Sequence, residues 1–205
     1  MPHNRAMRYL IGLILALQIW GLMGCVKRGV PNSAQSDSLK TSTRSKYLVE
    51  TAKGTFIIEL FDDTPAHKRN FEMLVERGYY NDLAFHRVVP ELIVQAGDSR
   101  FRSVPNPSLD SLDNRTLPAE IKHSHFRGTV AAARKDDKEN PQRASSASQF
   151  YINLNDNRFY DGNYTVFGRV IAGMETLDKI AKVERDANNV PLERVWIKIY
   201  PYDEK

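Results

Sequence analysis

The chain has 205 residues, of which 41% are hydrophobic and 26% are charged, and its formal net charge is +4. These values are ordinary for a soluble globular protein and leave room for one domain with a sizeable core. Because the chain has no cluster of lysine and arginine with interleaved aromatic residues, we do not expect nucleic acid as a partner.

The first 24 residues are predicted to be a signal segment rather than part of the fold. Arg5 and Arg8 give it a basic start, and the uncharged run over residues 9–24 is too short to span a membrane comfortably. The run leads into Leu22-Met-Gly-Cys25, and Cys25 is the only cysteine. This pattern resembles the lipobox of bacterial lipoproteins, in which the cysteine is lipidated and becomes the new N-terminus. The alternative is an uncleaved anchor helix with an incidental cysteine.

Residues 25–45 are predicted to be a flexible tether, because they are poor in large apolar residues and rich in serine, threonine and charge. The tether would connect a membrane, reached through lipidated Cys25, to a domain of residues 46–205. We therefore expect a lipid-anchored protein of the cell envelope. Since Val26 rather than an aspartate follows the cysteine, resemblance to Gram-negative lipoproteins implies the outer membrane, with the domain facing the periplasm.

The domain is expected to begin with a hairpin and a helix. Strands are predicted over residues 47–50 and 55–61 around a Lys53-Gly54 turn, because apolar residues alternate in the second of them. Thr64 is the expected N-cap of the helix that follows, and Gly78 is its expected end.

Further short strands follow along the rest of the domain. They are predicted over residues 84–89, 92–97, 128–133, 149–153, 166–170 and 195–200, with a second helix over 173–183. Residues 99–115 and 134–148 are polar and are expected to form loops. Many short strands with a helix near each end indicate a mainly β fold, which we expect to be a closed antiparallel barrel.

Several of these elements carry short motifs whose order and spacing resemble those of one family. The motifs are Gly54–Phe61 (GTFIIELF), Asn70-Phe71, Phe85–Pro90 (FHRVVP), Gln95–Asp98 (QAGD), Gly128–Ala133 (GTVAAA), Ser148–Ile152 (SQFYI) and Val166–Gly168 (VFG). From about Tyr47 to Tyr200 the chain resembles the cyclophilins, which are peptidyl-prolyl cis-trans isomerases. The resemblance implies a cyclophilin-like, closed eight-stranded barrel with two capping helices.

The resemblance also implies a function and its site residues. It implies a rotamase that accelerates X-Pro rotation in exported proteins, works as a monomer and needs neither cofactor nor metal. Arg87 falls on the catalytic arginine, and Gln95 falls on the glutamine that supports it. The substrate-binding positions are Phe85, Leu92, Ile93, Ala133, Arg134, Gln149, Tyr151, Phe159, Tyr160 and Tyr164.

Some positions depart from the usual family residues. Leu92 and Ile93 replace phenylalanine and methionine, Phe159 and Tyr164 replace tryptophan and histidine, and Glu91 replaces a glycine. The altered pocket keeps open an alternative function, a proline-peptide binding module or chaperone with little turnover. A β-barrel binding protein unrelated to the cyclophilins is a further alternative.

Three histidines of the domain are further candidate functional residues. His123 and His125 are two residues apart in an extended segment, but no third metal ligand is evident, so we expect a solvated loop. His86, inside a predicted strand, is expected to be a hydrogen-bonded structural histidine rather than a general base.

Overall fold

The computed structural model describes residues 45–203. The predicted signal segment, Cys25 and the predicted tether up to residue 44 lie outside the described residues. In the part of the chain that is described, no helix has both the length and the apolar character needed to cross a membrane.

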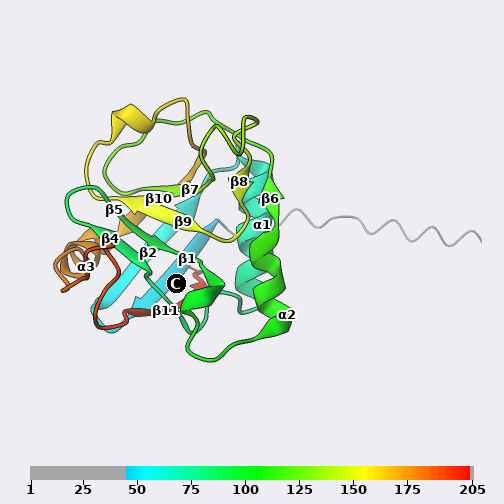
Figure 1. The fold of residues 1–205 in the computed structure, drawn as a ribbon. Coiled ribbons are helices and arrows are strands. Elements are labelled where there is room, and N and C mark those ends of the chain that lie inside the picture. The colour runs from blue at the N-terminus through cyan, green and yellow to red at the C-terminus, as the bar shows by residue number, and fades with distance from the viewer. Residues whose placement is uncertain (1–44, 204–205) are drawn as a thin grey trace, which may run out of the picture. The chain divides into compact units, whose positions relative to one another are not determined.

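The fold is built on one nine-stranded, curled sheet in which neighbouring strands run antiparallel (Figure 1). In pairing order the strands are β3 (Leu83–Ala84), β11 (Trp196–Pro201), β1 (Lys46–Thr51), β2 (Gly54–Leu60), β10 (Val166–Ala172), β7 (Thr129–Ala132), β9 (Phe150–Asn153), β5 (Ile93–Ala96) and β4 (Arg87–Val89). The mainly β architecture predicted from the sequence is therefore confirmed.

The closed, eight-stranded form of the barrel is not what the structure shows. The sheet has nine strands, and its two edges, β3 and β4, are separated in the chain only by Phe85 and His86. The N–H of Phe85 donates to the carbonyl oxygen of Val195, and the N–H of His86 donates to that of Gln95. The predicted continuous strand 84–89 breaks here because both side chains are buried, which ends the alternation. The two edge strands are thus connected through the chain itself and do not pair with each other by backbone hydrogen bonds.

The two predicted helices are present as α1 (Pro65–Glu76) and α3 (Met174–Ile180), on opposite sides of the sheet in Figure 1. Thr64 precedes α1 as expected, but its hydroxyl donates to the carbonyl oxygen of Phe61 and caps no helical N–H. The predicted loops hold further short elements. They are η1 (Ser99–Phe101), α2 (Pro107–Asp110) and η2 (Ser111–Asn114) in the first loop and β8 (Ser145–Ser146) in the second; β8 pairs with β6 (Thr116–Leu117), which directly follows the first loop.

Alternation along the strands sorts their side chains into two apolar clusters. The inner cluster fills the space enclosed by the sheet, and its strand residues include Val94, Val130, Phe150 and Ile152. The outer cluster contains the residues that alternate with them: Ile93, Ala131, Tyr151 and Val166. Because successive residues of a strand point to opposite faces, a buried inner core leaves every second residue of β5, β7 and β9 to build a surface on the outside.

Candidate active site

A row of paired residues crosses strands β4, β5, β9 and β7 on the outer face of the sheet. The register places Arg87 opposite Gln95, Gln95 opposite Tyr151, and Tyr151 opposite Ala131. Directly opposite residues of antiparallel strands have Cβ atoms about 4.5–5.5 Å apart. Strand pairing therefore brings together residues that are far apart in the sequence.

A short chain of hydrogen bonds orders the polar part of this row. Nη1 of Arg87 donates to Oε1 of Gln95 at 3.4 Å, and Nε2 of Gln95 donates to Oε1 of Gln149 at 3.2 Å. The Arg87 side chain is exposed, and no carboxylate within residues 45–203 forms an ion pair with it. Its positive charge is thus directed by Gln95 while remaining available to a ligand.

Beside Arg87 lies a pocket of about 270 Å³ with aromatic walls. Its lining consists of Arg87, Ile93, Gln95, Ala133, Arg134, Tyr151, Tyr160 and Tyr164. The centroid of the Tyr160 ring lies 6.0 Å from that of Tyr151 and 5.1 Å from that of Tyr164, and both contacts are edge-to-face. Burial raises the pKa of Tyr151 and that of Tyr160, so both hydroxyls keep their protons at neutral pH.

Arg134 and Tyr164, both of which line the pocket, pack against each other. The guanidinium carbon of Arg134 lies 4.7 Å from the centre of the Tyr164 ring, within the range of a cation–π contact. Its Nη1 also forms a 2.6 Å ion pair with Asp137, and the Arg134 side chain is only 5% exposed. Arg134 therefore supports the pocket wall through its side chain.

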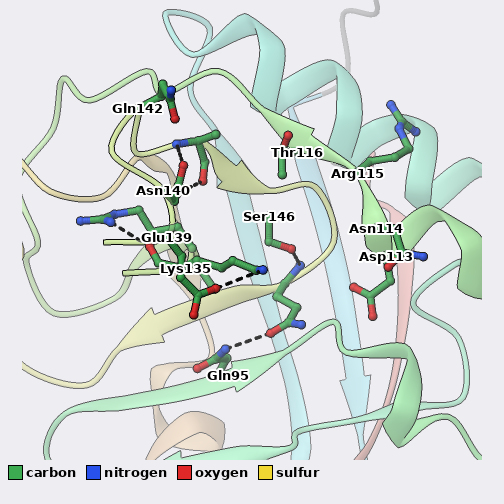
Figure 2. Close-up of a pocket in the computed structure, with 14 residues that line it drawn as sticks. Gln95, Asp113, Asn114, Arg115, Thr116, Lys135, Glu139, Asn140, Gln142 and Ser146 are labelled. Carbon is green, nitrogen blue, oxygen red and sulfur yellow. Dashed lines mark hydrogen bonds and ion pairs between the residues drawn. The ribbon is translucent and has the colours of Figure 1, made fainter. Parts of the chain in front are cut away.

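A second, larger cavity of about 630 Å³ continues from the pocket, with Gln95, Ala133 and Arg134 lining both (Figure 2). In Figure 2, Asp113 and Arg115 lie on one side of this cavity, and Lys135 and Glu139 lie on the other. Nζ of Lys135 and Oε2 of Glu139 are 3.3 Å apart. The pocket and the second cavity adjoin each other; the first has aromatic walls, and most residues that line the second are polar.

The structure brings together most of the residues predicted from the sequence. All eight residues that line the pocket are among them, Gln149 lines the second cavity, and Leu92 packs on the outer cluster next to the pocket. Phe85 and Phe159 are not among the residues that line the pocket. Phe85 is fully buried in the inner core because it lies on the opposite face from Arg87, and Phe159 is 66% exposed and packs against Tyr160 outside the pocket.

The prediction of a solvated loop at His123 and His125 is wrong for His125. Its side chain is fully buried, and its Nε2 lies 3.1 Å from the hydroxyl of Tyr151. The sequence did not indicate this burial because most nearby residues are polar, and the burial comes from contact with the distant pocket tyrosines. His86 is also buried, beside Phe101, but its Nδ1 has no hydrogen-bond partner among the described residues.

The buried histidines lead to a prediction on stability in acid. Burial lowers the pKa of His86 from 6.5 to about 4, against the opposing influence of Asp98. As the pH falls from 6.5 to 4, the unfolded chain takes up this proton first, so the free energy of unfolding decreases over that window, by about 3 kcal/mol for His86. Burial also lowers the pKa values of His67 and His125, which adds a slope of the same sign.

Urea denaturation at several pH values measures this slope. His86→Gln should show a smaller loss of stability between pH 6.5 and 4 than the wild-type protein. Equal slopes for the two proteins would mean that His86 takes up its proton as readily in the folded state as in the unfolded chain.

A family model and the curated relatives of this chain point to the same family. Residues 46–200 match the family model described as cyclophilin-type peptidyl-prolyl cis-trans isomerase. The chain is 33% identical over 180 residues to peptidyl-prolyl cis-trans isomerase A of Dickeya dadantii, which covers 81% of this chain and 88% of the relative. It is 36% identical over 159 residues to a peptidyl-prolyl cis-trans isomerase of Acinetobacter baylyi, with 73% and 80% covered.

Solved structures show the same fold. A crystal structure of a cyclophilin-type peptidyl-prolyl cis-trans isomerase from Cryptosporidium parvum has a TM-score of 0.67 and 26% sequence identity, and covers 79% of this chain and 99% of that one. A second structure of that protein, obtained in the presence of the dipeptide Ala-Pro, has a TM-score of 0.66 and 25% identity, with 78% and 99% covered.

The fold and the site define a mainly β protein that carries an arginine beside an aromatic-walled pocket on the outer face of its sheet. This chain belongs to the cyclophilin-type peptidyl-prolyl cis-trans isomerases, enzymes that accelerate rotation about X-Pro peptide bonds. Family membership thus favours the isomerase over the two alternatives considered from the sequence.

Proposed function

We propose that the reaction takes place in the pocket beside Arg87, with Arg87 as the catalytic residue and Gln95 as the residue that orients it. The observation that carries this proposal is the cross-strand row of Arg87, Gln95 and Tyr151, in which a guanidinium without a carboxylate partner among the described residues lies at the edge of an aromatic-walled pocket. Ile93, Tyr151, Tyr160 and Tyr164 would hold the proline ring.

The chemistry needs a fixed positive charge and no proton transfer. Amide resonance gives the X-Pro bond a rotational barrier of about 18–20 kcal/mol. Twisting the bond breaks the resonance and localises a lone pair on the prolyl nitrogen. A guanidinium that hydrogen-bonds to this nitrogen, or to the nearby proline carbonyl, stabilises the twisted state more than the planar one, and this differential binding accelerates the rotation. Arginine suits the task because its planar fork stays charged at any working pH.

The second cavity is proposed to receive the polypeptide on the side that leads away from the proline ring. Its lining is polar and includes Gln149, which is held by Gln95 and can bind a peptide group. A proline-containing polypeptide would then lie across both compartments, bound by the backbone at Ala133 and Arg134. That a related Cryptosporidium parvum protein was crystallised in the presence of Ala-Pro supports this class of partner.

Titration of the protein with a blocked Ala-Pro peptide, followed by amide chemical shifts, tests this placement. The largest changes are expected at Gln95, Tyr151 and Tyr160. Residues of α3 on another part of the molecule serve as the internal reference. Changes concentrated at α3, with none around Tyr151, would contradict the proposed pocket.

We also propose that the enzyme is a monomeric lipoprotein acting on exported proteins. The support is the sequence alone: the basic start, the apolar run that leads into Leu22-Met-Gly-Cys25, and the polar stretch over residues 25–45. With residues 1–24 removed as the signal peptide, the chains attached to Cys25 would anchor the isomerase domain of residues 46–205. The domain would face the periplasm from the outer membrane.

A substitution at the cysteine tests this location. Cys25→Ser is expected to abolish lipidation and signal processing, so that the protein accumulates as an unprocessed precursor. Mass spectrometry of the N-terminal peptide and membrane fractionation measure both effects. Wild-type protein found in the soluble periplasm without lipid would refute the anchor and leave the isomerase site unaffected.

A further inference from the structure

Behind the three tyrosines of the pocket lies a buried histidine that the proposed chemistry does not use. His125 precedes β7, and its side chain is fully buried. The centroid of its ring lies 6.2 Å from that of Tyr151, 5.7 Å from that of Tyr160 and 6.3 Å from that of Tyr164. All three pocket tyrosines therefore pack around this one imidazole.

Asp161 fixes the orientation of this imidazole. Its Oδ1 accepts hydrogen bonds from the backbone N–H of His125 at 2.7 Å and from Nδ1 of His125 at 3.1 Å, and its Oδ2 accepts one from Nε of Arg158 at 2.5 Å. Burial acts to raise the pKa of the Asp161 carboxyl, but hydrogen bonds from Arg158, His125 and Ser124 outweigh it and hold this pKa well below its usual range. Asp161 is thus a carboxylate at neutral pH and can only accept.

The carboxylate determines which nitrogen of His125 carries the proton. Because Asp161 accepts at Nδ1, the neutral imidazole has its hydrogen there and presents Nε2 as an acceptor. Nε2 lies 3.1 Å from the hydroxyl of Tyr151, which is within hydrogen-bond distance. The Tyr151 hydroxyl, which keeps its proton at neutral pH, is therefore the donor.

We propose that His125 is a positioning residue, which fixes the ring of Tyr151 in the pocket wall through the hydrogen-bond chain from Asp161 to His125 to Tyr151 and so makes proline binding depend on a neutral His125. The inference rests on the proposed role of this pocket in proline binding.

Protonation of His125 would reverse the last bond of the chain. Nε2 would then carry a hydrogen, the Tyr151 hydroxyl would have to turn to accept it, and the phenol hydrogen would lose its acceptor. The other groups around His125 are Asp161, the tyrosines at 160 and 164, Arg158 on Asp161, and Arg134 over Tyr164. Both arginines stay charged over the working range of pH, and burial lowers the pKa of His125, so the reversal is expected below the ordinary histidine pKa of 6.5.

Two single variants and their combination test the hydrogen bond. Tyr151→Phe keeps the ring and removes the hydroxyl, and should raise KM for a blocked Ala-Pro peptide about threefold to tenfold with little change in kcat. His125→Gln should have a similar effect. Because both changes remove the same bond, the double variant should be no worse than either single variant. His123→Gln, which alters the nearby histidine that pairs with Asp63 at the surface, is the matched control and should leave KM unchanged.

The pH profile supplies a readout that a purely structural role would not change. We expect the wild-type KM to rise as the pH falls through the midpoint at which His125 is seen to titrate by ¹⁵N NMR. In Tyr151→Phe, which has no hydroxyl to reorient, KM should be flat over the same range. A flat wild-type profile across that midpoint, or additive effects in the double variant, would overturn the inference.

The experiments also separate a failure of this inference from a folding defect and from a failure of the proposed site. If His125→Gln does not fold, as judged by circular dichroism, the Tyr151→Phe kinetics and the wild-type pH profile still decide the question. Loss of activity in Arg87→Ala together with an unchanged KM in Tyr151→Phe would reject this inference alone. Full activity in Arg87→Ala would instead reject the proposed site.

Discussion

Arg87→Ala is expected to lower kcat/KM for a blocked Ala-Pro peptide about 10²- to 10³-fold, the loss typical of removing one preorganised donor from a charge-stabilising site. The reason is the position of Arg87 at the edge of the aromatic pocket, where its guanidinium is oriented by Gln95 and paired with no carboxylate of the described residues. Because Arg87 is exposed on β4, its removal should leave circular dichroism and the melting temperature unchanged.

Two further variants sharpen this test. Arg87→Lys keeps the charge but lacks the planar fork, so it should recover only part of the lost activity. Arg169→Ala is the matched control, because it removes an exposed arginine that is hydrogen-bonded to Glu59 on β2, and it should be fully active. Wild-type turnover in a folded Arg87→Ala protein would show that the catalytic assignment is wrong.

Gly97→Ala is expected to lower the stability of the fold strongly. Gly97 has a φ of +102°, and a Cβ built there would lie 2.1 Å from the carbonyl oxygen of Ser148 and 2.8 Å from the Cα of Gln149. Backbone strain and overpacking together should lower the free energy of unfolding by about 4 kcal/mol. Since the clash displaces the segment that carries Gln149, kcat/KM of the remaining folded protein should fall as well.

Gly162→Ala is the control for the strain of a left-handed residue. Gly162 has a φ of +75°, but no atom lies within 4 Å of a Cβ built there. It should therefore lose only about 1 kcal/mol, the cost of the backbone conformation. Chemical denaturation of both variants measures the difference, and equal losses would mean that the close approach of Gly97 to Ser148 is not a constraint.

Local patterns in the sequence were sufficient to predict much of the sheet, whereas the residues of the site were predicted from the resemblance to the cyclophilins. The alternation around Arg87 and Gln95 places both on the face opposite the core, and strand pairing then adds Tyr151. Phe85 lies in the core, and not on the face of Arg87, because the alternation stops at Phe85 and His86, where two consecutive side chains are buried. Periodicity cannot indicate such a break, since it depends on how the edges of the curled sheet meet.

Other features depend on contacts between segments far apart in the chain. The two-residue strands β6 and β8 lie in polar stretches with no strand pattern of their own, and they form only because Thr116 and Leu117 pair with Ser146 and Ser145. From its local sequence His125 was likewise predicted to lie at the surface, because the contacts that bury it are with distant segments. Its burial comes from tyrosines of β9 and of the segment after β9, which the local sequence around His125 does not reveal.

The short edge strands of the sheet have a consequence for an enzyme whose substrates are polypeptide chains. A long exposed edge strand would offer a row of unpaired backbone groups on which an extended client could add as a further strand and from which aggregation could start. Here β3 has two residues and β4 has three, and the chain passes directly from one to the other. We therefore expect a proline-containing polypeptide to bind at the proposed pocket and second cavity rather than by adding a strand to an edge of the sheet.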